Sequence, residues 1–140
     1  MPGETNLTRL LATMRPRMQP NYFLFVTLPH GEPVPDAIDP VMVFWEDEGR
    51  TLIVEHQAAA RAGLAGTFLS RMITLDVHSS LDAVGFLAAI TARLAAHGMP
   101  VNPVSAYHHD HLFVPADREE EAVALLERLA REAAAEAASR

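Results

Sequence analysis

The chain alternates between segments whose apolar residues recur every three or four positions and short segments in which apolar and β-branched residues run together. The first pattern indicates one face of a helix, and the second, when bounded by Gly, Pro or Asn, indicates a strand. We expect helices at residues 6–14, 57–62, 81–97 and 117–131. We expect strands at residues 22–28, 41–45, 51–54, 67–77, 101–107 and 111–114.

Capping residues set the ends of the expected helices. Thr5 or Asn6 can cap the first helix, and Gly98 ends the long helix of the second half. Residues 117–120 read Asp-Arg-Glu-Glu and resemble a capping box for the last helix. We expect the Ala- and Glu-rich tail beyond residue 131 to fray.

Prolines and one arginine indicate where the expected strands end, bend or lie at a sheet edge. The proline-rich segment 29–40 cannot form a regular element, so we expect a surface loop or a lid there. Arg71 lies on the apolar side of the long strand 67–77, which indicates an edge or a bend near Ser70. Pro103 marks the strand that contains it as an edge strand or a bulged one.

The two halves of the chain give similar orders of elements. Residues 1–69 give a helix, a strand, a hairpin, a helix and a strand, whereas residues 70–140 give a strand, a helix, two strands and a helix. Both orders match parts of the split motif βαββαβ. We therefore expect an α+β protein of two tandem units, 1–69 and 70–140, with helices on one face of each antiparallel sheet. Because neither half covers its sheet alone, we expect strand 67–77 to serve both units and the halves to share a core. We also expect the chain to form a homodimer or a higher homo-oligomer.

Composition and charge exclude several classes of function. The 140 residues carry 11 basic and 18 acidic side chains, a formal charge of -7, which disfavours nucleic acid as a partner. The absence of cysteine excludes disulfides, thiol catalysis and Cys-ligated metals. No apolar run approaches the roughly 20 residues that cross a bilayer, and the N-terminal sequence lacks the pattern of a secretory signal. We expect a cytoplasmic protein with no membrane partner.

The segment Val77–Gly85 carries the first candidate chemistry. It joins an expected strand to the helix expected from Leu81, and Ser79 or Ser80 can cap that helix. The amides at such a helix start attract a carboxylate or a phosphate. Gly85 inside a helix costs about 1 kcal/mol relative to Ala, which indicates close packing or close approach of a ligand. A purely structural role, in which Ser caps and Gly packs, explains the same residues equally well.

The segment 107–111, Tyr-His-His-Asp-His, carries the second candidate. Three histidines and a carboxylate suggest a metal site, but an extended backbone directs His109 and His111 to one face, and His108 and Asp110 to the other. A third ligand would have to come from elsewhere, from Asp76, His78 or His30. We therefore favour a hydrogen-bonded turn over a metal site and expect no cofactor, although these side chains could also bond a small ligand.

No motif for nucleophilic catalysis is present. The sequence contains no GxSxG, P-loop or GxGxxG pattern. A dyad of His78 with the adjacent serine is poorly arranged, because neighbouring side chains in an extended segment point apart. We expect no catalytic residues.

Three segments carry a resemblance to a known family: ITLDVHSSLDAVGFLAAITARLAAHGMPVNPVSAYHHDHLFVP at Ile73–Pro115, GETNLTRLLATMRP at Gly3–Pro16 and YFLFVTLP at Tyr22–Pro29. In these segments the chain resembles the ACT-domain superfamily, and more closely a group of small stand-alone bacterial proteins with two tandem ACT-like units. The resemblance implies ferredoxin-like βαββαβ units that bind amino acids or similar effectors between paired domains. The first unit has no copy of SSLxAVG, so we expect it to be degenerate.

The resemblance also implies where a ligand would bind. The loop His78–Gly85 would contact it, with an amino-acid carboxylate at the amides of Ser80–Asp82 and its ammonium group at Asp110 or Asp82. Polar side chains of the facing strand would add hydrogen bonds. The expected ligand-binding residues are Ser79, Ser80, Leu81, Asp82, Val84, Gly85, Asn102, Ser105, His109, Asp110 and His111.

These inferences give one leading function and two alternatives. We expect a non-enzymatic regulatory module that binds a small molecule, with amino acids as the ligand class. The first alternative is an interaction or dimerisation module without a ligand. The second is a metal-dependent enzyme at His108–His111.

Overall fold

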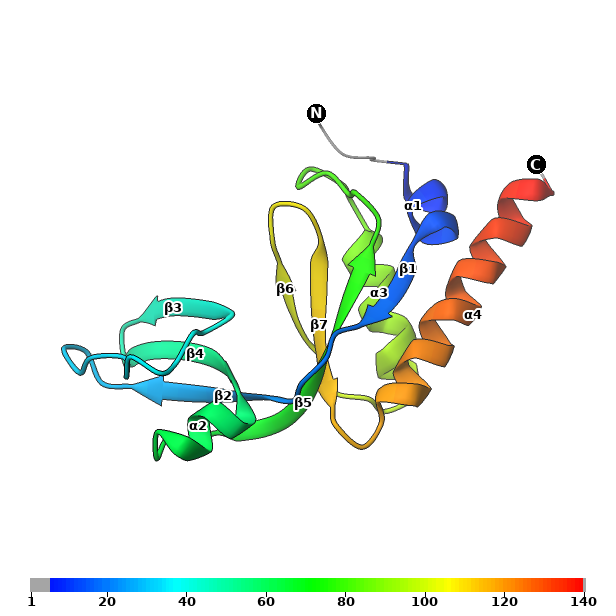
Figure 1. Cartoon of the computed structure of the whole chain (residues 1–140). Helices are drawn as coiled ribbons and strands as arrows, with labels where there is room; N and C mark the ends of the chain where they lie inside the picture. The colour runs from blue at the N-terminus through cyan, green and yellow to red at the C-terminus, as the bar shows by residue number, and fades with distance from the viewer. Residues whose placement is uncertain (1–5, 140) are drawn as a thin grey trace. The chain divides into compact units, whose positions relative to one another are not determined.

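A computed structural model describes residues 6–139 of the chain, which group into two compact units (Figure 1). Unit 1 combines the chain up to Gln19 with the chain from Met72 onward, and unit 2 is Pro20–Arg71. Strand β5 (Thr67–Asp76) crosses the boundary, so its first residues belong to unit 2 and its last residues to unit 1. The predicted division between residues 69 and 70 also falls within β5, and it stays a prediction.

Unit 2 is an antiparallel sheet covered by one short helix. The helix α2 (His56–Arg61) and the sheet strands confirm the predicted strand, hairpin and helix of this region. The strands are β2 (Phe23–Leu28), β3 (Met42–Glu46), β4 (Gly49–Glu55) and the start of β5, in the order β3-β4-β2-β5. The core of the unit consists of Val26, Leu28, Ile38, Leu52, Val54 and Ala59.

The proline-rich segment after β2 forms no helix or strand, as predicted. Arg50 on β4 fixes its start by donating to the carbonyl oxygens of Pro29 and Glu32. Ile38 anchors the segment in the core with 7% of its surface exposed. In unit 2 this loop therefore occupies the place of the first helix of the βαββαβ motif.

The bend expected in the long strand is present. Phe23 pairs with Ser70, but Phe25 pairs with Thr67, so β5 carries one extra residue between these pairs. Phe68 lies at this irregularity with a φ of 60°, a left-handed conformation that is uncommon for a bulky residue. The bend is therefore centred on Phe68, two positions before Ser70.

Unit 1 is a four-stranded antiparallel sheet in the order β1-β5-β7-β6. Its strands are β1 (Arg15–Met18), the end of β5, β6 (Asn102–Ser105) and β7 (Asp110–Pro115). Strand β1 was not predicted, because its four residues include Pro16 and carry little apolar pattern. In the structure Pro16 is opposite Leu75, and β1 lies at the edge of the sheet, where a residue without an N–H is tolerated.

Both units have the strand order of the ferredoxin-like fold. In unit 2 the four strands follow each other along the chain as β2, β3, β4 and β5. In unit 1 the strands β5, β6 and β7 fill the first three places of the motif, and β1, from the start of the chain, fills the fourth. This explains why unit 1 is assembled from two separate stretches of sequence.

Three helices cover one face of the sheet of unit 1 (Figure 1). They are α1 (Leu7–Thr13), α3 (Phe86–Ala96) and α4 (Glu119–Ala138). Asn6 caps α1 as predicted, its side chain accepting a hydrogen bond of 2.9 Å from the amide of Arg9. The core includes Leu10, Met14, Ile73, Leu75, Ile90, Leu94, Leu112, Val114, Ala122 and Leu126.

The start of α3 differs from the prediction. The helix begins at Phe86 and not at Leu81, and its N-cap is Gly85 with a φ of 89°. Leu81 and Val84, which fit the predicted apolar stripe, are 67% and 84% exposed. The prediction that Ser79 or Ser80 caps the helix is therefore wrong. The left-handed backbone of Gly85 interrupts the helical geometry that the spacing of apolar residues suggested.

Helix α4 also differs from its predicted ends. It continues to Ala138 rather than fraying beyond residue 131, and Ala133 is buried in the core. The predicted capping box is absent, since the N-cap Arg118 makes no side-chain capping bond. The Arg118 guanidinium instead donates to the carbonyl oxygens of His97 and Gly98, both at 3.0 Å. No helix within residues 6–139 is long and apolar enough to cross a membrane.

Candidate functional site

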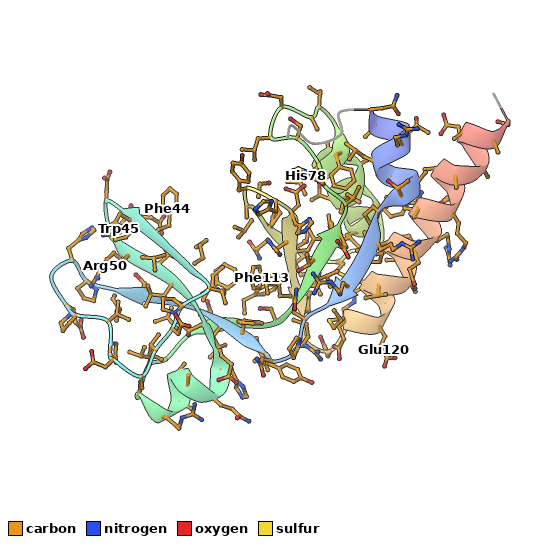
Figure 2. The ribbon with its side chains drawn as sticks, turned by 45° about the horizontal axis from the view of Figure 1, so that its top comes forward. Phe44, Trp45, Arg50, His78, Phe113 and Glu120 are labelled. Atoms are coloured by element: carbon orange, nitrogen blue, oxygen red, sulfur yellow. The ribbon has the colours of Figure 1, made fainter. Side chains whose placement is uncertain are left out.

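The loop between β5 and α3 is folded back on itself by short-range hydrogen bonds. The Ser80 hydroxyl oxygen accepts from the amide of Asp82 at 3.0 Å, and the Ser80 carbonyl accepts from the amide of Ala83 at 3.0 Å. His78, labelled in Figure 2, lies at the start of this loop. Gly85 ends the loop and turns the chain into α3. The segment SSLDAVG is therefore a compact loop that leads to a helix five residues later than expected.

The start of α3 offers backbone donors. The first amides of an α-helix have no acceptor within the helix, and the N-cap Gly85 supplies no side-chain bond. The residues that follow it, Phe86 and Leu87, both line a cavity next to the loop. The first turn of α3, where the helix dipole favours a negative charge, therefore lies at Phe86 and not at the predicted Ser80–Asp82.

The opposite wall of this cavity comes from the hairpin of β6 and β7. Ser105 ends β6 and Asp110 begins β7, and the two residues pair across the strands. The Ser105 hydroxyl donates to one carboxylate oxygen of Asp110. The turn is closed by a 3.0 Å hydrogen bond from the amide of Ala106 to the carbonyl of His109. This arrangement holds a carboxylate, with one oxygen engaged by Ser105, in the same cavity that Phe86 and Leu87 line.

The cavity between loop and hairpin has a volume of about 210 Å³. This is below the roughly 300–1,000 Å³ of pockets for drug-sized ligands, so a small metabolite fits its size. Five of the predicted residues line it, namely Ser79, Ser80, Leu81, Ser105 and Asp110. The lining residues that the sequence analysis missed are Ala83, Phe86, Leu87 and Ala106. If the start of the helix had been predicted at Gly85, Phe86 and Leu87 would have been among the predicted ligand-binding residues.

The other predicted residues do not line this cavity. Asp82, Val84 and Gly85 belong to the same loop but are not among the lining residues. Asn102 pairs with Phe113, and successive residues of a strand alternate between faces, so Asn102 lies on the opposite sheet face from Ser105. His109 and His111 are not among the lining residues either, and His111 alternates with Asp110 along β7, so it lies on the opposite sheet face.

His111 belongs to a hydrogen-bonded group on that opposite face. Its Nδ1 lies 3.0 Å from the hydroxyl of Thr74, and the Gln19 amide donates to the same hydroxyl at 2.8 Å. Burial lowers the pKa of His111 most, and the charge of His109 lowers it further. Asp110 opposes this change, and Arg17 lowers the pKa by the smallest amount. The neutral imidazole that results can accept a hydrogen bond from Thr74 at Nδ1.

The histidines do not assemble a metal site among the described residues. Within residues 6–139 no group of three or more His, Asp or Glu side chains is placed to hold a metal ion together. The ring centroids of His78 and His108 are 6.0 Å apart, and those of His109 and His111 are 6.4 Å apart. His109 instead lies with its Nδ1 3.2 Å from the carbonyl oxygen of Val77. The geometry therefore favours hydrogen bonding over metal ligation.

A second hollow, of about 370 Å³, lies on unit 2. Its lining residues are Phe25, Val26, Thr27, Thr51, Ala65, Gly66 and Thr67, none of which carries a charge. It is larger than the cavity of unit 1, but its lining residues include no carboxylate to pair with an ammonium group and no helix start to bind a carboxylate. We therefore assign the candidate site to the smaller cavity.

Comparison with protein families gives two matches, which overlap at residues 68–71. Residues 2–71 match one model described as an ACT domain, and residues 68–128 match a second model with the same description. None of the curated proteins matches the chain.

Comparison with solved structures supports the same fold. A Vibrio cholerae protein of unknown function, described as a possible transport protein, is 36% identical, with a TM-score of 0.79 over 89% of this chain and 95% of that one. An Agrobacterium tumefaciens protein is 16% identical, with a TM-score of 0.72 over 84% of this chain and 89% of its own. The ligand-free regulatory subunit of aspartate kinase from Thermus thermophilus is 13% identical, with a TM-score of 0.58 over 85% and 98% of the two chains.

Proposed function

Since the chain belongs to the ACT-domain family, whose domains are regulatory modules rather than catalysts, we propose that it is a non-enzymatic regulator that binds a free amino acid. The observation that carries the proposal is the cavity between the loop Ser79–Leu87 and the Ser105–Asp110 hairpin. It combines a helix start, hydroxyl groups and one carboxylate within a small volume.

The charges of the cavity match a zwitterion. The carboxylate of an amino acid would accept hydrogen bonds from the amides at the start of α3, beside Phe86 and Leu87. Its ammonium group would face Asp110, whose carboxylate is held by Ser105. The hydroxyl groups of Ser79 and Ser80 can accept from the ammonium group or donate to the carboxylate.

The walls indicate which amino acids fit. The apolar lining consists of Leu81, Ala83, Phe86, Leu87 and Ala106. With about 210 Å³ available, this lining favours a small apolar side chain over an aromatic or a charged one. The net charge of -7 further supports a zwitterion over an anionic metabolite.

Calorimetric titration with the twenty amino acids tests the proposal, followed by the variant Asp110→Asn. We expect at least one small apolar amino acid to bind. We expect Asp110→Asn to weaken it about 10-fold or more, because a charge-assisted contact is lost, a change of about 1.4 kcal/mol. Asp47→Asn, in the exposed β3–β4 turn, serves as the control that removes a carboxylate elsewhere. The proposal is wrong if no amino acid binds at millimolar concentration. It is also wrong if both variants bind the amino acid as tightly as the native chain does.

The alternative function is a protein-interaction module without a ligand. Two aromatic side chains of β3, Phe44 and Trp45, are 61% and 66% exposed and favour an interaction surface in addition to the cavity. Under either function we propose a cytoplasmic protein that acts through other proteins and not through nucleic acid or membranes. Binding of a metabolite decides between the two, because the alternative predicts none.

A further inference from the structure

The two walls of the candidate cavity are a loop and the end of a hairpin. The loop leaves β5 after Asp76, the hairpin turns between β6 and β7, and the two lie side by side in unit 1 (Figure 1). Hydrogen bonds to the hydroxyl and carbonyl groups of Ser80 fold the loop on itself, and a bond from Ala106 to His109 closes the hairpin. These bonds fix the shape of each wall but not the distance between the walls, on which the size of the cavity depends.

The side chain of His109 reaches from the hairpin to the loop. Its Nδ1 lies 3.2 Å from the carbonyl oxygen of Val77, within hydrogen-bond range. Because a carbonyl oxygen can only accept, Nδ1 is the donor and carries a proton, in the neutral ring as well as in the imidazolium form. This hydrogen bond therefore ties one wall of the cavity to the other.

Three residues that line the cavity are held next to this contact. The Val77 carbonyl also accepts from the amide of Ser79 at 3.0 Å, so it holds the loop and His109 together. On the hairpin side, the His109 carbonyl accepts from the amide of Ala106 at 3.0 Å, and Asp110 follows His109 in the chain. Ser79, Ala106 and Asp110 all line the cavity. A shift of His109 relative to Val77 would therefore move lining groups on both walls.

We propose that His109 is a positioning residue that sets the width of the cavity, and with it the size limit for the ligand. This inference rests on the proposed function, since it concerns how the same cavity binds a small apolar amino acid. The hydrogen bond to Val77 holds the walls at their spacing before a ligand arrives, so binding does not have to order them. Without the bond, the fraction of molecules with correctly spaced walls falls, and the apparent dissociation constant rises by the same factor. The looser cavity also discriminates less against larger side chains.

Two substitutions separate the effect of the hydrogen bond from that of the ring's bulk. The side-chain nitrogen of asparagine is as many bonds from the backbone as Nδ1 of histidine, so His109→Asn keeps a donor for Val77. His109→Leu keeps a branched side chain of similar reach but has no donor. His108→Leu removes an imidazole from the neighbouring exposed position of the same hairpin and is the matched control.

Calorimetric titration of the full chain with L-alanine, L-valine and L-phenylalanine measures the effect on binding. We expect His109→Leu to weaken binding of L-alanine or L-valine about 5-fold, the equivalent of one lost neutral hydrogen bond, and to reduce the preference over L-phenylalanine. We expect His109→Asn and His108→Leu to change binding by about 2-fold or less. Equal weakening in the two variants of His109, or no weakening in either, would overturn the proposal.

The ligand-free chain gives a second measurement that does not depend on amino-acid binding. In NMR spectra of the native chain with ¹⁵N-labelled histidine, the neutral ring of His109 should carry its proton on Nδ1, because only that tautomer can donate to Val77. We expect His109→Leu to shift the amide resonances of Ser79 and Ala106, and His109→Asn to leave them near their native positions. A neutral ring with Nδ1 unprotonated would overturn the proposal. The expected tautomer in a chain that binds no amino acid would contradict the proposed function and not the role of His109 in spacing the walls.

Discussion

At the scale of single residues, the segment 107–111 shows what strand periodicity can predict. Alternation along the chain predicted that His111 and Asp110 lie on opposite faces, and the structure confirms this, since His111 bonds Thr74 whereas Asp110 lines the cavity. That His109 shares the face of His111 stays a prediction. The chemistry of each face depended on partners that are distant in sequence. Thr74, which bonds His111, lies 37 positions away, so the sequence pattern gave no indication of it.

The environment of His111 predicts how stability depends on pH. Its folded pKa is below the ordinary 6.5, because burial and the positive charges of His109 and Arg17 disfavour the protonated ring. The unfolded chain therefore binds more protons than the folded chain as pH falls below about 6.5–7, so the free energy of unfolding decreases toward acid. His111→Asn keeps a hydrogen-bond acceptor for Thr74 but does not titrate. We expect it to flatten the pH dependence of urea unfolding between pH 8 and pH 5. A slope as steep as that of the native chain would contradict this assignment.

At the scale of elements, most helices and strands were predictable because their apolar spacing and boundary residues agree. Two errors arose where these signals conflict or are too weak. Leu81 and Val84 continue the helical spacing of α3, but Gly85 adopts a left-handed conformation that a helix cannot include. Strand β1 was missed because four residues with a proline carry too little apolar pattern. Packing against the rest of unit 1 decides both cases.

The observed start of α3 can be tested by Val84→Lys. Because Val84 is 84% exposed in the loop, we expect the substitution to change the free energy of unfolding by less than about 0.5 kcal/mol. A helix beginning at Leu81 would place Val84 in the apolar stripe, where a lysine would cost several times more. Leu94→Ala, at a fully buried position of the same helix, is the comparison and should cost about 2–5 kcal/mol. Equal costs from chemical denaturation would show that the helix starts earlier.

At the scale of the whole molecule, unit 1 is discontinuous in sequence. Its edge strand β1 and its helix α1 come from the first 19 residues, and α1 packs with α4 at the other end of the chain. The order of elements predicted that strand 67–77 serves two units. It could not show that the first helix belongs to the same unit as residues 72–139, which is unit 1 of the structure. No local pattern in the sequence encodes that pairing.

A fragment of residues 70–140 tests this assembly. Without β1 and α1 it exposes the apolar surface that Leu10 and Met14 cover, so we expect it to be largely unfolded or aggregated alone. Addition of a peptide of residues 6–19 should restore its native circular dichroism and a cooperative melting transition. A peptide with Leu10→Asp serves as the control and should not. A fragment that folds cooperatively without the peptide would show that the first segment is dispensable.

The central claim is that the cavity beside the start of α3 binds a small amino acid. The most direct measurement is a titration of the ¹⁵N-labelled full chain with small apolar amino acids, followed by amide chemical shifts. The account predicts saturable shifts concentrated at Ser79–Leu87 and at Ser105–Asp110. Saturable shifts confined to other residues, or none at millimolar concentrations, would contradict it.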